Sequence, residues 1–183
     1  RSNLDLRAAD FDEGFVVAST TIGGDALFRG MAVSKKFSME RGTRIDGCLD
    51  LQKARLLAFA YLDQLEFGPD ATFAIWNCTP QALLLKPKQI EGRLASQREE
   101  DHAKASEEFA VLKNNYQRLN WLDEEDWAYY QFKRESRLAG KGVGGVRGAV
   151  GRLVDYVVFD LGCAYGTSPL RVLQTAVVTI VFF

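Results

Sequence analysis

Apolar residues recur along the first half of the chain at steps of five or six positions. The centres of this repeat are Leu6, Phe11, Val17, Ile22, Phe28, Val33, Met39, Ile45, Leu51, Leu56, Leu62, Phe67 and Phe73. A second register, two residues before each centre, runs from Leu4 to Ala71 and holds only apolar residues or threonine. Polar residues and glycines occupy most of the positions between the residues of these two registers.

This spacing argues for a coil built from short strands. A helix would place apolar residues three, four and seven positions apart. On extended backbone, alternate residues share one face, so each centre and the residue two before it point the same way. We therefore predict a right-handed quadrilateral β-helix over residues 1–85, with glycine, Asp and Asn at its corners. The repeat centres make about three coils, and the apolar residues 82–85, after Pro80, are expected to close the solenoid.

Three stretches within the repeat resemble a known family. Residues 9–11, 24–28 and 48–56 read Ala-Asp-Phe, Gly-Asp-Ala-Leu-Phe and Cys-Leu-Asp-Leu-Gln-Lys-Ala-Arg-Leu. They are similar to pentapeptide-repeat proteins of the looser eleven-residue variety. Phe15 and Phe37 stand where that family usually carries a small residue, so the first coils are expected to be swollen or irregular. The resemblance implies a fold, whereas proteins of one fold serve many functions.

A helical pattern replaces the repeat after residue 95. Ser96 and Glu99 have the spacing of a capping box, in which a serine hydroxyl and a glutamate satisfy the free amides at a helix start. Apolar residues then follow at helical spacing, namely Phe109, Leu112, Tyr116 and Leu119. Together these signals predict a helix over about residues 97–119.

A second helix is expected directly afterwards. The acidic residues 123–126 suit the positive N-terminal end of a helix, and Gly140 is typical of a helix end. The sequence thus predicts an α-helical hairpin over residues 95–140, which resembles one tetratricopeptide-type hairpin. Its role stays open between a surface for a partner or subunit and a cap on the open end of the solenoid, which repeat proteins need for solubility.

The net charge and the reactive residue types make several classes of function unexpected for this chain. The chain has 23 basic and 24 acidic residues, so no net field favours nucleic acid as a partner. Cys48, Cys78 and Cys163 show no paired spacing, which indicates a reducing compartment without a disulfide framework. His102 lies among charged residues and is interpreted as a solvated helix residue. The sequence has no catalytic triad, metal-ligand spacing or phosphate loop, so neither an enzyme nor a cofactor is expected.

The glycines at 140, 142 and 145 formally satisfy the dinucleotide-binding pattern G-x-G-x-x-G. That motif needs a strand before it and a helix after it within a βαβ unit. A basic helix precedes it here, so residues 141–147 are interpreted as a flexible Gly-rich linker.

The composition changes again after Val146. Apolar residues recur at helical spacing at Leu153, Val154, Val157, Val158 and Leu161. Arg152, Asp155 and Asp160 fall elsewhere on the helical wheel, so residues 148–161 are predicted to form an amphipathic interfacial helix.

Residues 170–183 are almost entirely apolar. As a helix these 14 residues would span about 21 Å, whereas a bilayer core is about 30 Å thick and requires roughly 20 residues. They could form a buried core helix or, with Pro169, the start of a transmembrane helix over residues 169–183. Basic residues dominate the approach, namely Lys133, Arg134, Arg137, Lys141, Arg147, Arg152 and Arg171 against Glu135, Asp155 and Asp160. This excess favours the membrane interpretation, with residues 1 to about 168 on the cytoplasmic side of the cell membrane and in contact with membrane lipid.

The stretch around this approach also resembles a known family. Residues 163–173 read Cys-Ala-Tyr-Gly-Thr-Ser-Pro-Leu-Arg-Val-Leu. They are similar to the juxtamembrane stretch of prokaryotic pentapeptide-repeat proteins that carry a two-helix, potassium-channel-like pore. Tyr165 and Gly166 match a Gly-Tyr-Gly-type turn in that family, with Ala164 in place of its first glycine, and Pro169 opens the membrane entry.

The resemblance implies a homotetrameric cation channel whose pore residues follow Phe183. Arg152 and Asp155 are then expected to fix the interfacial helix, and Arg171 to anchor at the lipid headgroups. The first functional hypothesis is thus the cytoplasmic regulatory or assembly region of such a channel. The alternative is a soluble pentapeptide-repeat protein-binding module, as a scaffold or topoisomerase inhibitor. An inhibitor that mimics DNA would be strongly acidic, whereas residues 1–94 carry 12 basic and 12 acidic side chains.

Overall fold

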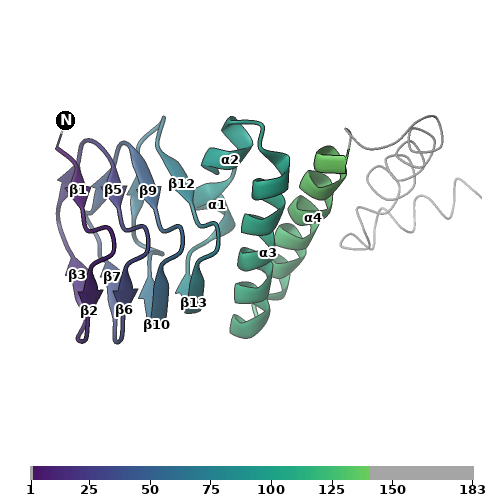
Figure 1. The fold of residues 1–183 in the computed structure, drawn as a ribbon. Helices are drawn as coiled ribbons and strands as arrows, with labels where there is room; N and C mark the ends of the chain where they lie inside the picture. The colour runs from purple at the N-terminus through teal and green to yellow at the C-terminus, as the bar shows by residue number, and fades with distance from the viewer. Residues whose placement is uncertain (1, 141–183) are drawn as a thin grey trace, which may run out of the picture.

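The computed structural model describes residues 2–140, which form a β-solenoid followed by four helices (Figure 1). The predicted linker at 141–147, the interfacial helix at 148–161 and the membrane entry at 169–183 lie outside the described residues. The same holds for the site residues predicted there, which are Arg152, Asp155, Tyr165, Gly166, Pro169 and Arg171. Within residues 2–140, no helix has both the length and the apolar character needed to cross a membrane.

Thirteen short strands build the coils of the described part. They are β1 (Leu4–Asp5), β2 (Asp10–Phe11), β3 (Phe15–Val17), β4 (Thr21–Ile22), β5 (Ala26–Leu27), β6 (Ala32–Val33), β7 (Phe37–Met39), β8 (Arg44–Ile45), β9 (Cys48–Asp50), β10 (Arg55–Tyr61), β11 (Glu66–Phe67), β12 (Thr72–Ala74) and β13 (Thr79–Leu84). All pairings between them are parallel.

The strands stack in four columns, which makes each coil four-sided. One column holds β1, β5, β9 and β12, and another holds β4, β8 and β11. The remaining two share β10 and β13, whose first halves continue β2 and β6 and whose second halves continue β3 and β7. Along the first column the paired residues are Leu4, Ala26, Leu49 and Phe73, so one coil takes 22 to 24 residues. This equals four units of the five-or-six-residue repeat, and the prediction of a β-solenoid is confirmed. Its right-handedness stays a prediction.

The solenoid has about four turns rather than the predicted three. The extra turn includes β13, although residues 82–85, after Pro80, were expected to close the solenoid. Pro80 instead pairs with Leu56 of β10. Because β13 lies at the edge of its sheet, a residue without an N–H group is tolerated there.

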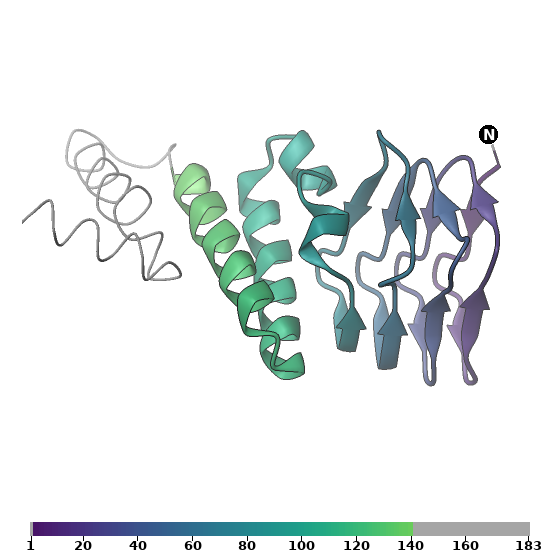
Figure 2. The same ribbon diagram turned by 180° about the vertical axis from the view of Figure 1, so that it is seen from behind.

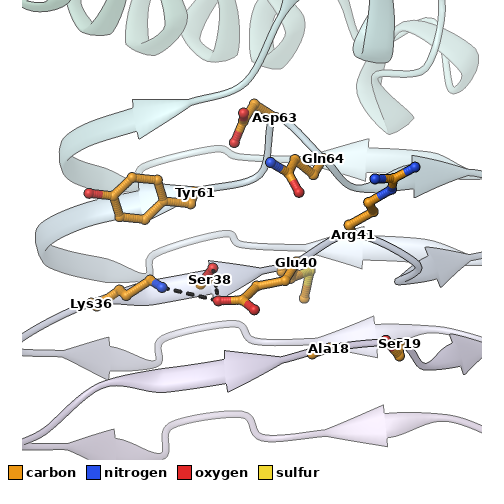
Figure 3. Close-up of a pocket in the computed structure, with 10 residues that line it drawn as sticks. Ala18, Ser19, Lys36, Ser38, Glu40, Arg41, Tyr61, Asp63 and Gln64 are labelled. Atoms are coloured by element: carbon orange, nitrogen blue, oxygen red, sulfur yellow. Dashed lines mark hydrogen bonds and ion pairs between the residues drawn. The ribbon is translucent and has the colours of Figure 1, made fainter.

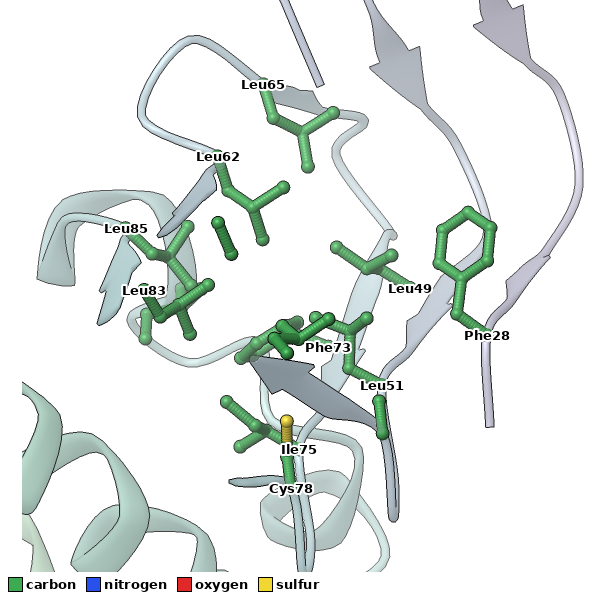
Figure 4. Packing of buried hydrophobic residues seen from close by; sticks show 14 of the residues in the cluster. Phe28, Leu49, Leu51, Leu62, Leu65, Phe73, Ile75, Cys78, Leu83 and Leu85 are labelled. Atoms are coloured by element: carbon green, nitrogen blue, oxygen red, sulfur yellow. The ribbon is translucent and has the colours of Figure 1, made fainter. Parts of the chain in front are cut away.

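The two predicted registers fill the interior of the solenoid. Every repeat centre from Ile22 to Leu62 is buried, and so is every second-register residue from Ala26 to Ala71. Figure 4 shows several of these side chains converging inside the coils. Four other centres are half-buried and pack against this cluster, namely Leu6, Phe11, Val17 and Phe67.

The large residues of the first coils pack on one another. Phe15 and Phe37 are paired across adjacent strands, with ring centroids 5.9 Å apart and ring planes 11° apart. Phe28 meets both rings edge-on. The step from the first coil to the second is the shortest, at 22 residues from Leu4 to Ala26, so these rings are accommodated without extra residues in the coil.

Four helices follow the last strand, and the two long ones form the predicted hairpin. They are α1 (Pro87–Ile90), α2 (Ala95–Arg98), α3 (His102–Leu119) and α4 (Leu122–Ala139). Asn120 ends α3 with a φ of 56°, in the left-handed region. The second long helix, α4, ends at Ala139, and Gly140 is its C-cap, as predicted.

The predicted start of the first long helix is wrong. Ser96 lies inside α2 and is buried, and its hydroxyl donates to the carboxylate of Glu108 instead of capping a helix. Glu100 then takes a φ of 58°, which breaks the helical path. The actual cap is Asp101, whose Oδ1 accepts from the backbone N–H of Lys104 at 3.1 Å.

His102 is a helix residue, as interpreted, and its side chain is partly exposed to solvent and partly engaged in a contact within the chain. Its Nδ1 lies 2.7 Å from Oε2 of Glu135, a carboxylate on α4 that is buried. Gln97 of α2 donates to the other oxygen of Glu135 at 2.6 Å. The histidine therefore helps to join the start of α3 to the end of α4.

Candidate functional site

Helix α3 lies directly against the last coil, and α4 lies on the far side of α3 (Figures 1 and 2). The outer edge of the last coil carries backbone N–H and C=O groups that no further strand satisfies. Buried backbone groups without partners are costly, so this edge needs other hydrogen-bonding groups. Polar side chains of α1 to α3 supply them.

Asn115 of α3 substitutes for a strand. Its Oδ1 accepts from the backbone N–H of Leu83 at 2.7 Å, and its Nδ2 donates to the carbonyl of the same residue at 2.8 Å. Asn115 is fully buried. The hydroxyl of the next residue, Tyr116, donates to the carbonyl of Leu85 at 2.8 Å. Burial raises the pKa of Tyr116, so the hydroxyl keeps its proton for this bond.

Glu108 serves a neighbouring part of the same edge. Its Oε1 accepts from the backbone N–H groups of Ile75 and Trp76 at 2.8 and 3.1 Å, while its other oxygen accepts from Ser96. Burial of the side chain raises the pKa of Glu108, and these hydrogen bonds oppose that shift. Glu107 accepts from the Trp76 indole nitrogen at 2.5 Å.

The segment before α3 covers the opposite side of the coil. Nε2 of Gln89 donates to the carbonyls of Leu62 and Leu65 at 2.9 and 3.0 Å. Nη1 of Arg93 donates to the carbonyl of Gly68 at 2.6 Å. The backbone of Arg93 accepts from the N–H of Phe73, so the chain itself continues the sheet for one bond.

These contacts show that the hairpin caps the solenoid. From the sequence, capping and partner binding were both possible roles of the hairpin, and neither Glu108 nor Asn115 was predicted to take part. A signal for both was present, because they lie at helical spacing with Phe109 and Leu112 on the apolar face of α3. A polar residue on a buried helix face indicates a specific buried hydrogen-bond partner.

A second feature is an apolar patch on β10. Five large apolar residues of the described part are exposed, namely Val16, Leu57, Phe59, Tyr61 and Leu122. Of these, Leu57, Phe59 and Tyr61 form the patch on the outer surface of β10, because alternate residues of a strand point outward. The corresponding corner of the first two coils is polar, at residues 12–14 and 34–36. The coil therefore does not require apolar residues at this corner.

A pocket of about 410 Å³ adjoins this patch (Figure 3). Lys36 lies over the ring of Tyr61, 5.4 Å from its centroid, and its Nζ lies 3.1 Å from Oε1 of Glu40. Arg41 and Asp63 line other parts of the pocket and are exposed. The pocket thus offers charges of both signs beside an aromatic ring, which suits binding of mixed polar and apolar groups rather than covalent chemistry.

The two described cysteines are poor nucleophiles. Burial raises the pKa of Cys78 to about 12 and also raises the pKa of Cys48. The thiolate is the reactive form, so neither thiol is activated. Among residues 2–140, no cluster of His, Cys, Asp and Glu side chains could hold a metal ion.

These features define the class of protein as a β-solenoid of about four turns with a helical cap. Compared with models of protein families, with curated proteins and with solved structures, the chain gives no match. The features that bear on function are the cap, the outer patch and the order of segments along the chain.

Proposed function

We propose that this chain is the cytoplasmic regulatory or assembly region of a prokaryotic cation channel of the potassium-channel-like, homotetrameric type. The finer assignments belong to the same proposal: a pentapeptide-repeat solenoid of right-handed coil, an interfacial helix at 148–161 and a membrane entry at 169–183. The observation that carries it is the order of segments. The helical cap of the solenoid ends at Gly140. A stretch with several basic residues follows directly, and an apolar stretch comes after it.

The cap gives this proposal a mechanical basis. Phe109 packs edge-on against Trp127, with ring centroids 5.6 Å apart, and Trp121 stacks on Tyr116 at 6.1 Å. Together with the contacts of Glu135, these contacts hold α4 firmly on α3, which in turn is bonded to the last coil. A displacement of the solenoid would then move Gly140, and with it the start of the segment that we place at the membrane.

The membrane step can be tested with the 183-residue chain. We expect it to float with vesicles that contain anionic lipid, through its basic residues and residues 169–183. Replacing both Val177 and Val178 with aspartate should abolish flotation, because a charged residue in a bilayer core costs about 2.5 to 3.5 kcal/mol. Glu66→Gln on β11, about 100 residues before that segment in the sequence, is the control. A wild-type chain that stays with the soluble fraction contradicts the membrane assignment.

The channel step needs the complete gene product. We expect a second hydrophobic span and a pore loop to be encoded after Phe183, and the full-length protein to conduct cations in planar bilayers. If no such sequence follows, the channel proposal fails even when the chain binds vesicles.

The apolar patch on β10 favours one other function, a soluble protein-binding module. Leu57 and Phe59 are about half exposed, and exposed apolar patches often mark protein contacts. This alternative gains support if the chain remains soluble and the patch residues are needed for partner binding. It loses support if their replacement changes nothing.

A further inference from the structure

We draw no further inference here: the strongest candidate, the surface patch of Leu57, Phe59 and Tyr61 on β10 with the pocket beside it, is an unpartnered apolar face, and nothing in the described part of the chain shows what covers it.

Discussion

Replacing Asn115 with leucine tests whether a side chain does the work of the missing next strand. Leucine has nearly the same size, so it fills the space on α3 without a large cavity. It cannot accept from the N–H of Leu83 or donate to its carbonyl, and both of these bonds are present in the protein. Two buried backbone groups at the edge of β13 would be left without partners.

The expected loss of stability follows from those two groups. Each buried polar group left unsatisfied costs about 1 to 3 kcal/mol, so the loss of partners for two such groups should lower the free energy of unfolding by about 2 to 6 kcal/mol. For a chain of this size, a loss of about 3 kcal/mol lowers the Tm by about 6 to 12 °C. Asn114→Leu is the matched control, because Asn114 is exposed on the same helix. It should change stability by less than about 0.5 kcal/mol.

Urea unfolding, followed by circular dichroism and tryptophan fluorescence, measures both variants. Hydrogen exchange at the amide of Leu83 adds a local readout, and in Asn115→Leu this amide should exchange much faster than in wild type. If Asn115→Leu loses less than about 1 kcal/mol, or behaves like Asn114→Leu, then the amide does not replace the strand bonds. The account of α3 as a hydrogen-bonding cap would then be refuted.

Three further outcomes are expected. Phe28→Ala should cost about 3 to 5 kcal/mol in urea unfolding, because it leaves a cavity in the core, whereas Leu57→Ala on the exposed corner should cost little. The raised pKa of Glu108 means that the folded state binds more protons than the unfolded state above pH 4.5. Wild type should therefore lose stability relative to Glu108→Gln as the pH rises from 4.5 through the folded pKa, and a parallel pH dependence of both proteins would contradict this. The Cys78 thiol, with its pKa of about 12, should resist iodoacetamide at pH 8 until urea unfolds the chain, as mass spectrometry of its peptide will show.

The interior of the solenoid was predictable because its period is visible in the sequence. Each centre and its second-register partner, such as Phe28 and Ala26, had to point the same way on extended backbone. The fourth turn was not predictable in this manner, because Pro80 normally marks a break. Its position at the sheet edge, where no N–H is needed, is known only from the tertiary arrangement.

The side-chain contacts within the cap were not predictable for a similar reason. The spacing of Ser96 and Glu99 satisfies a local capping rule, yet the Ser96 hydroxyl bonds to Glu108, twelve residues away. His102 and Glu135 meet across 33 residues. Such contacts depend on how α2, α3 and α4 pack, and a periodic pattern along one helix contains no record of them.

The cap contacts only the last two coils through its polar side chains, since Gln89, Glu108 and Asn115 all bond to residues between Leu62 and Leu83. The earlier coils pair only with their neighbours. Insertion or loss of a whole coil before residue 48 would thus lengthen or shorten the rod by about 4.8 Å and leave the helices in the same orientation. The solenoid is in this sense an adjustable spacer, whose length evolution can change in units of 22 to 24 residues while the attachment at Gly140 stays as it is.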